Sequence, residues 1–132
     1  MENIKVFISY DYNNDKQYKN LLLAWDANNI FDFSLNDQSV DVPVNITDAP
    51  AIKRVISSKI NASKNFLCIV GENTNKSEWV AWEIEKAVEL GKKIIAVKTK
   101  KSNETPPELL GIGASWALSF TFDAIKKAIE ST

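Results

Sequence analysis

The residue types that this chain lacks limit the chemistry it can perform. Its 132 residues include no histidine and a single cysteine, Cys68. These absences exclude Ser-His-Asp and Cys-His nucleophilic catalysis, histidine or thiolate zinc sites, and disulfides within the chain. Any reaction must therefore use carboxylates, hydroxyls, amides, lysines or the backbone, and we expect no metal site.

The segment from Ser77 to Gly91 combines several such groups at helical spacing. Trp79, Glu83 and Lys86 are three or four residues apart, so they share one face of the expected helix. Ser77 can cap the start of this helix, and Gly91 fits the position just after its end. The neighbouring face carries an apolar stripe of Val80, Ile84, Ala87 and Val88. Spacing alone favours a structural interpretation, in which Glu83 is a solvated acid paired with Lys86 and both tryptophans of the segment pack.

A second group of polar residues follows the first predicted strand. Ile4 to Ser9 is a short apolar, β-branched run typical of a strand buried on both faces. Ser9, Tyr10 and Asp11 then present a hydroxyl, a phenol and a carboxylate together. The structural interpretation is that Ser9 and Asp11 satisfy backbone groups of a turn, and the residues by themselves favour it.

Two nucleotide- or phosphate-dependent classes lack their motifs in this sequence. A phosphate-accepting receiver domain needs an aspartate at the end of its third strand, where this chain has Val70, Gly71 and Glu72. Gly111 and Gly113 do not join a convincing strand to a helix, so the dinucleotide fingerprint is absent. A receiver-like regulatory domain is thereby disfavoured.

Strands and helices alternate along the chain. After the first strand we predict a helix capped by Asp15 and running to about Asn28, a strand over Phe31–Leu35, and a loop from Asn36 to Thr47. The remaining predicted elements are a helix capped by Asp48 with apolar positions Ile52, Val55, Ile56 and Ile60, a strand over Phe66–Val70, the Ser77 helix, strands over Lys93–Lys98 and Ala114–Phe120, and a final helix capped by Thr121 or Asp123.

This alternation predicts a single α/β domain over residues 1–132. Right-handed crossovers would give a flavodoxin-like three-layer sandwich around a mostly parallel five-stranded sheet. Ligands of such sheets bind at the carboxyl ends of the strands. We therefore expect a cleft built from Ser9 to Asp11, the loop from Asn36 to Thr47, and the loop from Gly71 to Ser77.

The composition is that of a globular domain without a strong electrostatic field. Hydrophobic residues make up 45% and charged residues 25%, and 16 basic against 17 acidic side chains give a formal charge of −1. Such a balance disfavours nucleic acid as the main ligand. The opening residues enter a strand pattern directly and no apolar run is long enough to span a bilayer, so we expect a cytoplasmic protein.

Two segments resemble a known family. The FISY run of Phe7 to Tyr10 and the SEWVAWEI run of Ser77 to Ile84 resemble two motifs of Toll/interleukin-1 receptor (TIR) domains. Residues 7–40 and 77–98 more closely resemble the bacterial TIR-like branch of ThsB-type sensors from Thoeris antiphage systems. The resemblance implies a flavodoxin-like fold and, in enzymatic members, cleavage of NAD at the nicotinamide–ribose bond.

The resemblance also assigns roles to residues of this chain. The catalytic glutamate of the family falls on Glu83, its companion tryptophan on Trp79 and the helix-start serine on Ser77. Other residues fall near the expected NAD cleft, namely Ser9, Tyr10, Asp11, Asn36 and Asp37. The loop after the second strand departs from the usual TIR pattern.

Thoeris-like members are expected to make a cyclic or isomeric ADP-ribose signal that activates a partner effector. NAD is then the substrate, and no separate cofactor is expected. A phage-derived trigger and self-association are further partners that the resemblance implies. Because NAD depletion endangers the host, we expect an inactive resting state, with the loop from Asn36 to Thr47 as a candidate cover of the cleft.

The residues available are compatible with this reaction. Loss of nicotinamide leaves positive charge on the ribose and needs no general acid, so one carboxylate such as Glu83 can suffice. An aromatic side chain such as Trp79 or Tyr10 can pack against a ring of the substrate. The alternative is a non-catalytic TIR-like interaction module that recognises a phage or host protein. Exposure of Trp82 and Trp116 would favour that alternative.

Overall fold

The computed structural model describes residues 3–12, 14–27, 34–37 and 49–131. Within these residues, five parallel strands form one sheet in the order β2-β1-β3-β4-β5. The strands are β1 (Asn3–Ser9), β2 (Ser34–Asp37), β3 (Asn65–Val70), β4 (Lys93–Lys98) and β5 (Ser115–Ala117). The predicted flavodoxin-like sheet is thereby confirmed.

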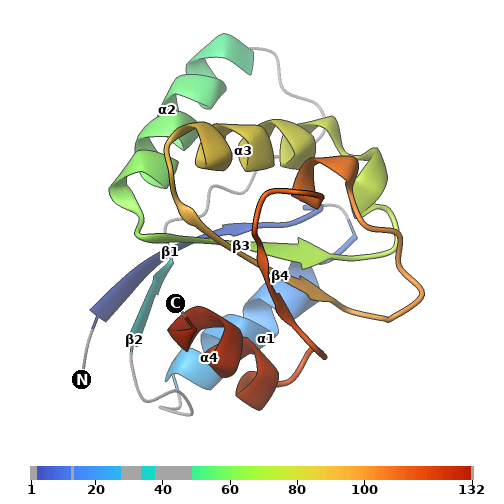
Figure 1. Cartoon of the computed structure of the whole chain (residues 1–132). Helices are drawn as coiled ribbons and strands as arrows, with labels where there is room; N and C mark the ends of the chain where they lie inside the picture. Colours follow the sequence, from blue (N-terminus) through green and yellow to red (C-terminus); the bar gives the residue numbers. More distant parts are fainter. Residues whose placement is uncertain (1–2, 13, 28–33, 38–48, 132) are drawn as a thin grey trace.

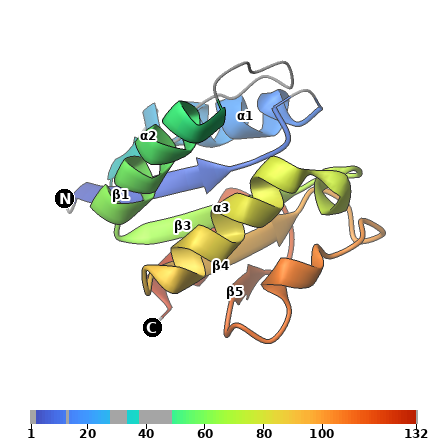
Figure 2. The same ribbon diagram turned by 90° about the horizontal axis from the view of Figure 1, so that it is seen from above.

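Helices cover both faces of this sheet, as Figures 1 and 2 show. On one face lie α1 (Lys16–Ala27) and α4 (Phe122–Glu130), and on the other lie α2 (Ala49–Ala62) and α3 (Glu78–Glu89). Two short 3-10 turns, η1 (Thr74–Lys76) and η2 (Pro107–Leu109), precede α3 and β5. The chain therefore forms the expected three-layer sandwich.

The alternation of side chains along β1 decides which residues can meet α3. Val6, Ile8 and Tyr10 belong to the apolar cluster under α1 and α4, whereas Phe7 belongs to the cluster under α2 and α3. Successive residues of a strand point to opposite faces, so Ser9 shares the face of Phe7. The last polar residue of β1 is thus directed toward the helix that carries Glu83.

Capping groups fix the start of α3 and of α4 as the sequence predicted, whereas Asp48, the predicted cap of α2, lies outside the described residues. The Ser77 side chain accepts a hydrogen bond from the backbone N–H of Val80 at 3.2 Å, and Gly91 adopts a φ of 71° just after α3. Of the two candidate caps of α4, Thr121 is the one that accepts from Ala124, at 3.3 Å.

The structure corrects the end of the second strand and the burial of two valines. The second strand ends at Asp37 rather than Leu35, so Asn36 and Asp37 belong to β2, and the rest of the predicted loop lies outside the described residues. Val88, from the predicted apolar stripe of its helix, and Val55, one of the apolar positions of the preceding helix, are about half exposed. Residues four apart rotate about 40° around a helix, which turns Val88 away from the sheet that Ile84 contacts.

The last strand is shorter than predicted, covering Ser115–Ala117 instead of Ala114–Phe120. Its last residue pairs with Val97, and β4 itself ends one residue later at Lys98. The chain beyond Ala117 therefore has almost no neighbouring strand to pair with, and Leu118 is 87% exposed. Among the described residues, no helix has the length and apolar character that crossing a membrane requires.

Candidate active site

A buried hydrogen bond joins the first strand to the third helix. The hydroxyl of Ser9 donates to Oε1 of Glu83 over 2.6 Å. Ser9 is 1% and Glu83 5% exposed. The structural interpretation of Glu83 is wrong, because Lys86 pairs instead with Glu89, with 3.0 Å between Nζ and Oε2. Glu83 is a buried carboxyl held by a hydroxyl, not a solvated surface acid.

Burial dominates the electrostatics of Glu83. Loss of hydration raises its pKa to about 8, and the hydrogen bond from Ser9 acts in the opposite direction. Cys68 of β3 pairs in register with Ser9, and burial together with the nearby Glu83 raises the pKa of its thiol. Within the described part of the chain, Ser9 is the one hydrogen-bond partner of the Glu83 side chain. Near neutral pH the protonated form therefore predominates in this structure.

A second buried carboxyl lies at the start of α1. Asp15 is 5% exposed, and the hydroxyl of Thr74 lies 3.4 Å from its Oδ2. The same hydroxyl accepts a hydrogen bond from the backbone N–H of Gly71 at 2.7 Å. Burial, followed by the charge of Asp11, raises the pKa of Asp15. Asp15 and Thr74 thus connect α1 to the loop that leads into α3.

This connection was not foreseen from the sequence, which indicated only a helix cap at Asp15. The backbone of Asp15 does lie at that position, since its carbonyl accepts from the N–H of Tyr18 at 3.0 Å. Its side chain, however, lies against Gly71, where an added Cβ would be 2.0 Å from Oδ2. A glycine directly after an apolar strand is the one signal of such a close approach.

Ser77 and Trp79 both belong to the start of α3. Ser77 caps the helix six residues before Glu83, which fixes where the helix begins. The half-buried ring of Trp79 lies edge-on to Trp82 with centroids 6.3 Å apart, and Nζ of Lys53 from α2 is 5.8 Å from its centre. The contacts given by the structure place Trp79 in the junction of α2 and α3, one helical turn from Glu83.

Tyr10 and Asp11 do not join the Ser9–Glu83 pair. Tyr10 packs in the cluster on the opposite face of the sheet, with Nζ of Lys19 5.3 Å from its ring centre. The carboxylate of Asp11 accepts from Nδ2 of Asn14 at 2.6 Å, and its carbonyl accepts from the N–H groups of Asn14 and Asp15. The turn interpretation therefore describes Asp11 but not Ser9.

Asn36 and Asp37 are aligned with an earlier part of β1. In the register of the two strands they pair with Lys5 and Val6. Val6 is three residues before Ser9, which corresponds to about 10 Å along a strand. The backbone of β2 thus does not bring these two residues beside Ser9, and residues 38–47 of the predicted loop are outside the described part of the chain.

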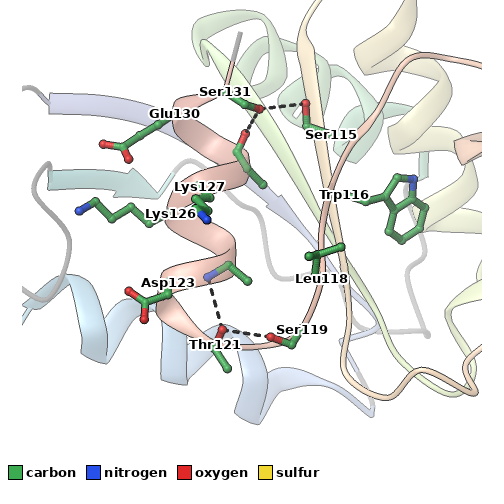
Figure 3. A pocket seen from close by; sticks show the side chains of 12 residues that line it. Ser115, Trp116, Leu118, Ser119, Thr121, Asp123, Lys126, Lys127, Glu130 and Ser131 are labelled. Atoms are coloured by element: carbon green, nitrogen blue, oxygen red, sulfur yellow. Dashed lines mark hydrogen bonds between the residues drawn. The ribbon is translucent and has the colours of Figure 1, made fainter.

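Among the hollows formed by the described residues, two bear on the predicted sites. A polar one of about 450 Å³ lies beyond the ends of β3 and β4, between residues 72–76 and 100–104. Of the three segments expected to build the predicted cleft, only the loop from Gly71 to Ser77 lines this hollow, and Ser9 to Asp11 do not. A hollow of about 940 Å³ lies between β5 and α4, where Figure 3 shows Trp116 and Leu118 on one side and Lys126 and Lys127 on α4. Among the described residues, no three acidic or cysteine side chains are grouped to hold a metal ion.

The arrangement at Ser9 and Glu83 suits stabilisation of a cation. A positive charge beside a buried carboxyl lowers its pKa, because attraction between the charges offsets the cost of burying the carboxylate. Such a carboxyl therefore ionises when a cation binds next to it. The same group, once ionised in a site that excludes water, stabilises positive charge more strongly than it would in solution.

Known proteins share both the fold and the sequence pattern. The family model of the Thoeris protein ThsB, TIR-like domain, matches residues 7–104. No match is found among curated proteins.

Three solved structures have a similar fold. A 2-desoxiribosyltransferase from Leishmania mexicana is 16% identical, with 98% of this chain and 99% of that chain covered and a TM-score of 0.58. A conserved protein from Enterococcus faecalis is 15% identical, with 77% and 67% covered and a TM-score of 0.55. TIR domains of the activated Roq1 resistosome are 13% identical, with 76% and 64% covered and a TM-score of 0.51.

At these identities the solved structures show the fold, whereas the family match covers most of the sequence, including both segments that resemble TIR motifs. The chain therefore belongs to the family of the Thoeris protein ThsB, TIR-like domain.

Proposed function

We propose that this chain is a TIR-type enzyme of antiphage defence that consumes NAD. It cleaves the bond between nicotinamide and ribose and makes a cyclic or isomeric ADP-ribose signal, which activates a partner effector. NAD is the substrate, and no further cofactor takes part. The observation that carries the proposal is the buried hydrogen bond between Ser9 and Glu83, because it joins the two segments that resemble TIR motifs. Membership of the ThsB family supports the same class of reaction.

The chemistry follows from the charge changes of the reaction. When the C1′–N bond breaks, its electron pair moves to the nicotinamide nitrogen, which neutralises the pyridinium and leaves positive charge on the ribose. The Glu83 carboxylate stabilises this charge. Water, or an adenine nitrogen or ribose hydroxyl of the same molecule, then attacks C1′, and the proton released on attack passes to the Glu83 carboxylate.

The raised pKa of Glu83 fits a substrate that is itself a cation. In the resting protein, burial keeps the carboxyl largely protonated near neutral pH. The pyridinium of bound NAD favours the ionised form, since an opposite charge nearby lowers the pKa of a carboxyl. Substrate binding thereby produces the carboxylate that the reaction uses.

The burial of Glu83 also supports an inactive resting state. A carboxyl that is 5% exposed cannot touch a dinucleotide without a local rearrangement. A phage-derived trigger or self-association would supply that rearrangement, and the purified protein is expected to have low basal activity.

A non-catalytic interaction module is the second candidate, and one observation favours it. Trp116 is 37% and Leu118 87% exposed beside the hollow of Figure 3, and large exposed apolar side chains tend to anchor protein partners. Trp82, by contrast, is half-buried. In this alternative Trp116→Ala abolishes protection against phage, while Glu83→Gln leaves protection intact.

The experiment is an assay of nicotinamide release from NAD in extracts of phage-challenged cells. Wild type should release nicotinamide, Glu83→Gln should not, and Glu85→Gln, which changes an exposed acid of the same helix, should match wild type. Equal release from Glu83→Gln and wild type would contradict the proposal. The same extracts should also be given 2′-deoxynucleosides as substrates, with release of the base as the readout, because one structural neighbour is named as a 2-desoxiribosyltransferase.

A further inference from the structure

We propose that the polar hollow beyond β3 and β4 binds the ribose–phosphate part of a nucleotide. This inference rests on the proposed function, since it assigns the hollow to the part of NAD that lies away from the broken bond. The hollow, of about 450 Å³, is formed entirely by the loops that follow these two strands.

The position of the hollow suits a ligand that also reaches Glu83. β3 ends at Val70, two residues after Cys68, which pairs with Ser9. Two strand residues correspond to about 7 Å, so the hollow begins a short distance beyond the Ser9–Glu83 pair on the same edge of the sheet. Parallel sheets bind their ligands at this edge.

Two cations are available for phosphate. Lys76 and Lys100 both line the hollow and are exposed. Among the described residues, neither ammonium group has an ion-pair or hydrogen-bond partner. One comes from the loop after β3 and the other from the loop after β4, so the two flank the hollow from different segments. An ammonium group is a common ligand of phosphate oxygens.

The remaining polar groups suit sugar hydroxyls. Glu72 supplies a carboxylate of the kind that accepts ribose hydroxyl protons in nucleotide sites, and so does Glu104, whose Oε2 already accepts a hydrogen bond from Nδ2 of Asn75. Their presence beside the lysines disfavours a ligand that carries only negative charge. Among the described residues, no aromatic side chain lines the hollow, so these residues supply no stacking surface for a base. A group that bears both phosphate and hydroxyls is the best match.

Asn103 adds a buried acceptor to this lining. It is 7% exposed, and its Nδ2 donates to the carbonyl of Val70 at 2.9 Å and to Oγ1 of Thr99 at 2.8 Å. Its Oδ1 has no donor partner within the described part of the chain. A buried carbonyl oxygen without a donor is uncommon, and a ligand hydroxyl would satisfy it.

Calorimetric titration with ADP-ribose tests the inference on the full chain. Relative to wild type, the double variant Lys76→Gln/Lys100→Gln should weaken ADP-ribose binding by about tenfold or more, because it removes two charged donors. The matched control Lys59→Gln/Lys127→Gln makes the same charge change on α2 and α4 and should leave the affinity unchanged. Nicotinamide riboside, which carries no diphosphate, should respond to neither double variant.

Several results would overturn the inference. These are an absence of ADP-ribose binding by wild type, an equal loss in both double variants, or an unchanged affinity in Lys76→Gln/Lys100→Gln.

Different results would contradict the proposed function and not the inference about the hollow, or the reverse. If triggered wild type and Glu83→Gln both leave NAD intact while ADP-ribose binding depends on Lys76 and Lys100, the hollow binds nucleotides but the enzyme assignment is wrong. If NAD cleavage depends on Glu83 but the double lysine variant keeps the wild-type KM, the enzyme assignment holds and the hollow is not the subsite.

Discussion

The carboxyl group of Asp15 lies against the α-carbon of Gly71, so close that a Cβ at residue 71 would be 2.0 Å from Oδ2. Asp15 opens α1, whereas Gly71 follows β3 and begins the loop that leads into α3. Thr74 links the two through its hydroxyl. The start of the helix that carries Glu83 is therefore anchored to the start of α1.

Replacing Gly71 with alanine should destabilise the protein by about 2 kcal/mol or more, since the new methyl group overlaps a buried carboxyl. Urea unfolding measures this loss. In an Asp15→Ala background the overlap disappears, so the same Gly71→Ala change should cost much less there. Equal costs in the two backgrounds would mean that the Asp15 contact is not the cause.

Replacing Glu83 with glutamine should change how stability depends on pH. The pKa of Glu83 is about 8 in the folded protein and 4.5 for the unperturbed group, so folding binds a proton between these values. Stability from this group is fully present below about pH 4.5 and is lost as pH rises through 8. Glu83→Gln cannot ionise, so it should gain stability relative to wild type, on the order of a few kcal/mol, between pH 5 and pH 9.

Urea unfolding of both proteins across this pH range tests the Glu83 prediction. The difference between wild type and Glu83→Gln is the relevant quantity, because Asp15 also has a raised pKa and contributes equally to both curves. A difference that stays constant with pH would show that Glu83 ionises in the folded protein as readily as in the unfolded chain.

Replacing Ser9 with alanine should raise the pKa of Glu83 further, because the Ser9 hydrogen bond is the interaction that lowers it. In the triggered enzyme, the acidic limb of the pH–rate profile should move to higher pH. A displacement of about one unit lowers activity at pH 7 roughly tenfold. Ser9→Thr keeps a hydroxyl and should restore part of the wild-type profile, whereas a uniform loss of rate at every pH would argue against this positioning role.

Removing the side-chain cap of α3 or of α4 should lower the free energy of unfolding, and removing that of α4 should leave activity unchanged. Ser77→Ala and Thr121→Ala each delete a side chain that accepts from a backbone N–H at a helix start, and each should cost about 1 kcal/mol. Thermal or urea unfolding gives this cost. Thr121 caps α4, so its loss should leave NAD cleavage unaffected, and a reduced rate in Thr121→Ala at constant protein concentration would show that capping loss alone impairs the assay.

Local sequence patterns were sufficient for the order of the elements but not for their contacts. The apolar run of β1 and the cap at Ser77 are short-range features, and both were predicted. The contact between Ser9 and Glu83 spans 74 positions. From spacing alone Glu83 resembled a surface acid, because a buried carboxyl and a solvated one occupy a helix with the same periodicity, and only the resemblance to TIR motifs distinguished it.

Other differences have similar physical causes. Val88 fits the apolar stripe by spacing, yet the rotation of about 40° between residues four apart turns it away from the sheet, and it is exposed. Asp15 was identified as a cap from its type, while the direction of its side chain depends on Gly71, a residue 56 positions later. Asn36 and Asp37 looked like the start of a loop because polar residues are uncommon in strands, but pairing with Lys5 and Val6 includes them in β2.

The most direct test of the central claim is nucleotide profiling by mass spectrometry during phage infection. Cells expressing wild type, Glu83→Gln or Glu85→Gln would be compared with and without phage. If the buried Glu83 carboxyl performs the reaction, wild type and Glu85→Gln should lose NAD and accumulate a new ADP-ribose isomer on infection, and Glu83→Gln should show neither change. Protection against phage by wild type with no change in NAD or ADP-ribose species would contradict the enzyme assignment and favour the interaction module.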